Sequence, residues 1–236
     1  MIGKYIKFAG FLRDWRRFKS FKSDRFPMDW NNKKPCLYDK TKETGFDRHY
    51  VYHPAWAARV LKETNPKKHI DIASTLHFSS IISAFLPIEF YDYRPANLVL
   101  PNLSSRAADL MALPFKDKSV DSLSCMHTIE HIGLGRYGDP IDPDGDLKSI
   151  KELQRVLAVK GNLLFVVPIG NTPKIIFNAH RIYSYKQIIG YFPELTLKEF
   201  SLIPEHAERG GLIRNADPRI TEKERYACGC FWFERN

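Results

Sequence analysis

The stretch "AADLMALPFKDKSVDSLSCMHTIEHIG", residues 107–133, contains the features that decide the fold of this chain. Residues 120–126 have the length and apolar content of a strand. Asp109 precedes a Leu-Pro-Phe turn by four residues, and the pair Glu130 and His131 follows the strand. Acidic and imidazole groups are therefore expected at the ends of strands, which is where ligands bind in α/β proteins.

Strands and helices alternate on both sides of this stretch. The other predicted strands are 69–73, 87–93, 105–109, 162–168, 195–203 and 227–233. The first predicted helix starts at Pro54 and stops before "TNPKK". Three more helices are predicted at 78–85, at 147–161 and at 184–192, and Gly161 is the stop signal of the second of these three. This alternation predicts an α/β fold with a seven-stranded, mostly parallel sheet and helices on both faces.

The central stretch resembles class I S-adenosylmethionine-dependent methyltransferases. The likeness rests on Asp109 before "LPF", on "KDKSVD" at 116–121 and on "EH" after the strand, and it extends over residues 54–204. It implies a Rossmann-like methyltransferase fold, S-adenosyl-L-methionine as the cofactor, and a contact between Asp109 and the adenine amino group.

A second acid follows a strand at Asp92, 21 residues after Asp71. That spacing is close to the one at which an acid meets a ribose hydroxyl in nucleotide-binding folds. The methyltransferase family places an acid and three alternating glycines after the first strand, and Asp71 matches the acid. We assign seven residues to the cofactor site: Asp71, Ala73, Thr75, Asp92, Asp109, Leu110 and His127.

The three glycine positions are occupied by Ala73, Thr75 and His77. Thr75 and His77 carry polar atoms that can hydrogen-bond the methionine end of the cofactor, and they also carry bulk that can fill its place. We expect the first outcome, in which both side chains point into the cleft.

Methyl transfer to a hydroxyl requires a base, and the catalytic candidates are His131, its partner Glu130, and His180 in "NAHRIYSY". The loop at 133–146 carries four aspartates that could hold Mg²⁺ or Ca²⁺. It lacks the full calcium pattern, and Asp146 suits the role of cap for the next helix, so turns are favoured and no metal is expected.

The N-terminal segment holds most of the net charge of +9. Residues 1–22 contain seven basic residues and one acid, with aromatic and aliphatic residues at roughly helical spacing. This pattern is typical of a basic amphipathic helix on an anionic membrane, and equally of a terminal helix packed on its own domain. An RNA-binding arm is the weakest alternative, so nucleic acid is not an expected partner.

The 236 residues suggest one main domain at 54–236, preceded by a basic amphipathic segment and cap at 1–53. Four scattered cysteines do not form a disulfide framework, and "CGC" at 228–230 is one residue short of CxxC. No apolar run of 18 residues or signal-peptide pattern occurs. We therefore expect a cytoplasmic protein, in peripheral contact with the membrane where the tail binds it.

Three segments, at 46–61, 130–147 and 177–185, are similar to an uncharacterised methyltransferase-like family found among bacterial surface-polysaccharide genes. The function implied is methylation of a sugar, a glycan precursor or another small polar acceptor. Two alternatives remain: a non-catalytic binding module of a glycan-assembly system, and an enzyme that uses another nucleotide.

Overall fold

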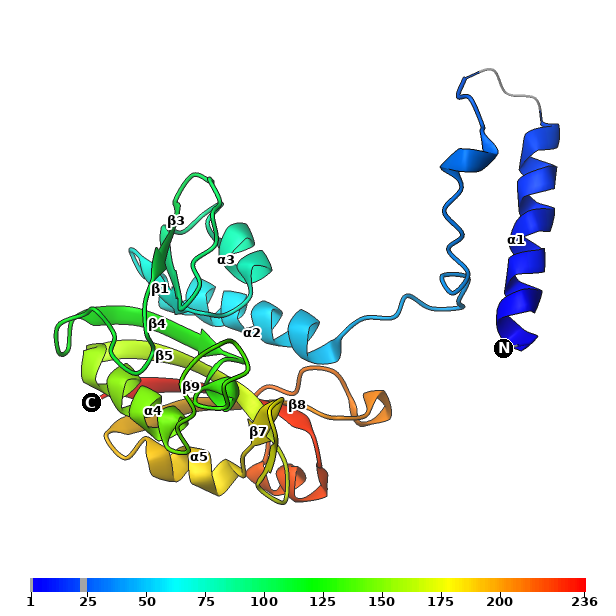
Figure 1. Ribbon diagram of the computed structural model, residues 1–236. Helices are drawn as coiled ribbons and strands as arrows, with labels where there is room; N and C mark the ends of the chain where they lie inside the picture. The colour runs from blue at the N-terminus through cyan, green and yellow to red at the C-terminus, as the bar shows by residue number, and fades with distance from the viewer. Residues whose placement is uncertain (1, 22–24) are drawn as a thin grey trace. The chain divides into compact units, whose positions relative to one another are not determined.

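The computed structural model describes residues 2–21 and 25–236, and it divides into two compact units, Met1–Phe46 and Asp47–Asn236 (Figure 1). The sequence places this division at 53/54, which falls inside helix α2 (Arg48–Thr64). The helix starts earlier than Pro54 because Asp47 caps it, accepting a hydrogen bond from the backbone N–H of Tyr50 at 3.1 Å.

The larger unit contains a seven-stranded sheet with the order β3-β2-β1-β4-β5-β9-β8. Its strands are β1 (His69–Ile72), β2 (Ile88–Asp92), β3 (Leu103–Ala107), β4 (Val120–Met126), β5 (Leu157–Ile169), β8 (Leu195–Ile203) and β9 (Ala227–Arg235). β9 runs antiparallel to both of its neighbours, and the other pairs are parallel. The chain reverses its direction of progress between β1 and β4, and this switch point is where α/β sheets bind ligands.

Helices cover both faces of this sheet, as the sequence predicts (Figure 1). On one face, α2 and α3 (Leu76–Ile82) bury residues such as Trp56 and Phe78. On the other face, α4 (Gly145–Val156) and α5 (Tyr185–Tyr191) bury Leu153 and Ile188. The remaining elements are the hairpin β6 (Lys174–Ile176) and β7 (His180–Ile182) and the 3-10 turns η1 (Trp30–Asn32), η2 (Ile129–His131), η3 (Ala207–Arg209) and η4 (Pro218–Lys223).

The prediction for α4 is wrong at both ends. The helix begins at Gly145, so Asp146 lies inside its first turn, and it ends at Val156 instead of Gly161. Gly161 lies within β5, where a Cβ would come within 2.8 Å of the Ala158 carbonyl oxygen. The glycine is needed there because two backbone segments approach closely, and it does not stop a helix.

The smaller unit contains α1 (Ile2–Ser20), so the predicted N-terminal helix is present. The rings of Phe11 and Trp15 lie 6.4 and 5.2 Å from the ring of Trp30, measured between centroids. Several apolar side chains of the segment remain exposed: Tyr5, Ile6, Phe18 and Phe21. Met1 and Lys22, which belong to the predicted tail, lie outside the described residues. Within the described ranges, no helix is long and apolar enough to cross a bilayer.

Candidate functional site

A cavity of about 190 Å³ opens at the carboxyl ends of β1, β2 and β4, at the switch point of the sheet. Five of the seven residues assigned to the cofactor site line it: Ala73, Asp92, Asp109, Leu110 and His127. His131 lines it as well, and Tyr137 and Asp139 contribute to its wall from the loop after η2. The fold therefore brings most of the site residues predicted from the sequence to one cavity.

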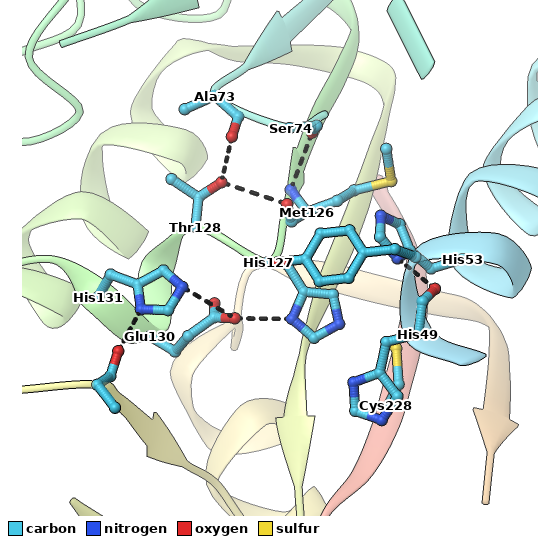
Figure 2. Close-up of polar contacts among 12 residues, drawn as sticks. His49, His53, Ala73, Ser74, Met126, His127, Thr128, Glu130, His131 and Cys228 are labelled. Carbon is cyan, nitrogen blue, oxygen red and sulfur yellow. Dashed lines mark hydrogen bonds and ion pairs between the residues drawn. The ribbon is translucent and has the colours of Figure 1, made fainter. Parts of the chain in front are cut away.

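Ala73 occupies the first glycine position of the cofactor loop in a glycine-like conformation. Its φ of +52° is left-handed, a conformation that costs a residue with a Cβ about 1–2 kcal/mol. The surroundings hold it there. Its N–H donates to the Tyr91 carbonyl at 2.7 Å, and its carbonyl accepts the Thr128 hydroxyl at 2.9 Å (Figure 2). At this position the chain thus adopts the left-handed conformation that glycine normally provides.

Thr75 and His77 do not reach the cavity, contrary to the expectation from the sequence. Thr75 is the N-cap of α3, and its hydroxyl accepts the N–H of Phe78 at 3.2 Å. His77 is exposed in the first turn of the same helix. Neither residue lines the cavity. They neither supply polar contacts to a ligand there nor fill its place, because the start of α3 turns both side chains elsewhere.

Asp71 is fully buried and does not line the cavity. Its carboxylate accepts the hydroxyls of Ser79 at 2.6 Å and Ser124 at 2.5 Å, which joins β1 to α3 and β4. Burial raises its pKa to about 6, although these hydrogen bonds act in the opposite direction. Asp71 therefore positions the elements around the cavity instead of contacting a ligand.

Asp92 and Asp109 lie at the cavity wall after the neighbouring strands β2 and β3. One carboxylate oxygen of each residue is used locally: Asp92 accepts the N–H of Arg94 at 2.7 Å, and Asp109 accepts that of Met111 at 2.8 Å. The second oxygen of each has no hydrogen-bond partner among the described residues. These turns fix the carboxylates while leaving one acceptor on each for a ligand.

The predicted catalytic pair is buried beside the same cavity. Glu130 Oε1 lies 2.7 Å from His127 Nδ1 and 3.8 Å from His131 Nε2. Burial, the largest single cause, raises the pKa of Glu130, but His127, His131 and the backbone together lower it, so the net pKa is below its ordinary value. Burial lowers the pKa of His131, whose Nδ1 lies 2.6 Å from the Ala179 carbonyl oxygen. His131 is therefore neutral near pH 7, with its proton on Nδ1, and is able to accept another.

His180 lies next to this pair but not on the cavity. Its ring centroid is 6.5 Å from that of His131, and it is not among the lining residues. Burial lowers its pKa as well. The structure therefore places two of the three catalytic candidates together and gives direct access to the cavity only to His131.

Three of the four aspartates of the loop at 133–146, all except Asp144, bind the chain itself. Asp139 accepts the N–H of Gly133 at 2.8 Å, and Asp142 pairs with Lys148 at 2.5 Å. Asp146 accepts the Tyr183 hydroxyl at 2.9 Å instead of capping a helix. These contacts agree with the interpretation of the loop as a series of turns.

Three residues that were not among the predicted site residues surround His127 on the side away from Glu130. His49 and His53 come from α2 and Cys228 comes from β9 (Figure 2). We call these three residues and His127 the histidine–cysteine cluster. The available signal was the spacing of His49 and His53, since residues four apart lie on one face of a helix. The helix was predicted to start at Pro54, which hid this signal.

Comparisons with known proteins agree with the fold. A family described as a Caenorhabditis protein of unknown function, DUF268, matches residues 110–192. The YcgJ protein of Bacillus subtilis is 14% identical, with a TM-score of 0.53, covering 78% of this chain and 98% of that chain. A Burkholderia thailandensis 1,6-didemethyltoxoflavin-N1-methyltransferase, solved with S-adenosylhomocysteine, is 10% identical, with a TM-score of 0.52 and 78% of each chain covered.

A third similar structure, the [4+2]-cyclase SpnF, is 11% identical, with a TM-score of 0.53, covering 82% of this chain and 84% of that chain. No curated protein matches the sequence. A cyclase among the similar structures means that the fold alone does not determine the reaction. The strand order and these similarities show that the chain has the Rossmann-like fold of class I S-adenosylmethionine-dependent methyltransferases.

Proposed function

We propose that this protein is an S-adenosylmethionine-dependent methyltransferase that acts on a sugar or another small polar acceptor. The observation that carries the proposal is the pair of cavity-lining acids, Asp92 and Asp109, each with a carboxylate oxygen that no described residue hydrogen-bonds, at the switch point. A ribose diol and an adenine amino group are donors that suit these two acceptors. The left-handed Ala73 supports the proposal, because it adopts the conformation that glycine normally provides at this position of the cofactor loop.

The proton step is assigned to His131. S-adenosylmethionine, when bound, supplies an electrophilic methyl group. The neutral imidazole of His131 lines the cavity and can take the proton from an acceptor hydroxyl as that oxygen attacks. Glu130, 3.8 Å from His131 Nε2, would then stabilise the imidazolium that forms.

The binding of S-adenosylhomocysteine, followed by calorimetry, tests the proposal directly. We expect one site on the full-length chain, with affinity greater than that for adenosine. Binding of adenosine but not S-adenosylhomocysteine would favour an enzyme or binding module that uses another nucleotide. Binding of neither compound would reject the proposal.

For the setting, we propose glycan or surface-polysaccharide assembly at the cytoplasmic face of a membrane. The support is the resemblance of three sequence segments and the composition of α1, whose exposed Tyr5, Ile6 and Phe18 alternate with basic residues. We expect the full chain to co-sediment with anionic vesicles at physiological salt and a chain lacking residues 1–22 to remain in solution. Equal sedimentation of both would reject membrane contact, and retention on RNA alone would favour a nucleic-acid arm.

A further inference from the structure

Two ring nitrogens of the histidine–cysteine cluster have no hydrogen-bond partner among the described residues. Donor atoms of His49, His127 and Cys228 all lie within 4.8 Å of one another, and all three residues are buried. The rings of His53 and His127 lie 5.0 Å apart between centroids. Nε2 of His127 and Nε2 of His53 are buried and have no hydrogen-bond partner among the described residues. Such atoms each cost about 1–3 kcal/mol if they stay unsatisfied.

The other ring nitrogen of His127 and of His53, Nδ1, already faces a hydrogen-bond acceptor. His127 Nδ1 lies 2.7 Å from the carboxylate of Glu130, and His53 Nδ1 lies 2.7 Å from the backbone carbonyl of His49 (Figure 2). A proton on each Nδ1 satisfies these acceptors and leaves a lone pair on each Nε2. Metal-binding histidines in proteins are held in this way, by a carboxylate or a backbone carbonyl on the nitrogen that does not bind the ion.

From this arrangement, we propose that His49, His127 and Cys228 bind a divalent transition-metal ion of the zinc class as its three protein ligands. The site is distinct from the aspartate loop, and its existence does not depend on methyl transfer. It joins three elements that are far apart in the sequence, α2, β4 and β9. Because His127 also lines the cavity, the ion would fix one wall of it.

The donor set and its charge determine the class of ion. Imidazole and thiolate suit Zn²⁺ and Co²⁺, whereas Mg²⁺ and Ca²⁺ require oxygen donors. The Cys228 thiolate and the Glu130 carboxylate beside His127 would offset the two positive charges of the ion. A tetrahedral zinc site needs donor atoms roughly 3.3–3.6 Å apart, which is closer than the 4.8 Å within which these donors lie. The rings of His49 and His127, stacked with centroids 5.1 Å apart, would therefore turn toward the ion when it binds.

Cobalt titration tests this site without any cofactor or substrate. The full chain, carrying no histidine tag, is stripped with a chelator under reducing conditions and titrated with Co²⁺. We expect one equivalent to produce tetrahedral absorption together with a thiolate-to-cobalt charge-transfer band, and Zn²⁺ to displace it. Zinc at about a hundred times its Kd should also raise the melting temperature by roughly 5–10 °C.

Two buried cysteines on β9 give a matched pair of variants. Cys228→Ser should lose the charge-transfer band, whereas Cys230→Ser, whose sulfur lies 3.9 Å from that of Cys228, should keep it. Glu130→Gln should weaken Co²⁺ binding about 10–100-fold while preserving the band, because it weakens the acceptor that orients His127 and leaves the three ligands in place.

Two results would overturn the proposal. The first is a wild-type chain with neither a charge-transfer band nor a zinc-dependent melting temperature, which would leave ordered water as the partner of the orphan nitrogens. The second is a full band in Cys228→Ser. If that variant does not fold, the wild-type titration and melting curves decide the question alone.

Discussion

Two groups of side chains with different chemistry lie at the cavity and next to it. The acid side consists of Asp92 and Asp109, which line the cavity, and the buried Asp71, which does not; it comes from three adjacent parallel strands and the turns that follow them. The histidine side consists of His127 and His131, which line the cavity, and of His49 and His53, which do not; it comes from a helix, a strand end and a 3-10 turn. Each acid is used by neighbours close in sequence or in the sheet, whereas the histidines become a group only when α2 packs on the sheet. Local motifs therefore reveal one side and conceal the other.

The largest loss of stability is expected from substitution of Glu130, on the histidine side. The residue is 1% exposed, and Glu130→Ala leaves the buried His127 Nδ1–H without its acceptor. Removing one partner of a buried pair costs about 3–5 kcal/mol. We expect that loss in the free energy of unfolding, measured with urea at pH 7.5 in the presence of a chelator. The exposed Glu208→Ala should change stability by less than about 0.5 kcal/mol. Equal effects for both variants would mean that the histidine side contributes little to the fold.

On the acid side, the next largest change in stability is expected from substitution of Asp71, and it depends on pH. Its folded pKa of about 6 lies above the ordinary aspartate value of 3.8, so the folded state binds the proton more tightly. The stability that results is complete below about pH 4 and is lost as the pH rises through 6. Asp71→Asn cannot ionise, so its stability relative to wild type should increase by up to about 3 kcal/mol between pH 4 and pH 8. Urea unfolding across this range measures the difference, and a constant difference would contradict the raised pKa.

The sheet and the acid side could be predicted from the sequence because both depend on short, local sequence patterns. The apolar runs at 120–126 and 195–203 coincide with β4 and β8 residue for residue. Asp92 and Asp109 reach the cavity because strand ends in a parallel sheet converge on one edge. Thr75 was misplaced because a polar residue after a strand can cap the following helix instead of facing a ligand.

The histidine side was hidden by one boundary error. With α2 assumed to begin at Pro54, His49 and His53 fell in an irregular connector and their spacing carried no meaning. Proline does not mark the start of this helix, because the Asp47 cap lies seven residues earlier. Cys228 belongs to a "CGC" that falls one residue short of CxxC and was set aside, and the antiparallel insertion of β9 beside β5 brings it to His127. Tertiary contacts of this kind leave no spacing in the sequence.

A smaller effect is expected on ligand binding, when the acids that line the cavity are substituted and compared with an acid elsewhere. Asp92→Asn and Asp109→Asn each replace a carboxylate by an amide, which weakens a charge-assisted hydrogen bond to a ligand donor. We expect binding of S-adenosylhomocysteine to weaken by about 1–3 kcal/mol for each, measured by calorimetry, with the melting temperature unchanged. Asp121→Asn, an exposed acid at the opposite end of β4, is the control and should bind normally. Normal binding by both cavity variants would remove the acid side from the site.

The smallest effect concerns the backbone of the cofactor loop, where Ala73 has a φ of +52°. Glycine adopts this conformation without a Cβ penalty, so Ala73→Gly should stabilise the fold by about 1 kcal/mol. Ala58→Gly, within α2, is the matched control and should destabilise by about 0.5–1 kcal/mol, because glycine loses more conformational freedom in a helix. Urea unfolding of the two variants should therefore give opposite signs. If Ala73→Gly also destabilises, the hydrogen bonds to Tyr91 and Thr128 do not hold the loop in a left-handed course, and the acid side loses its resemblance to a glycine-built cofactor site.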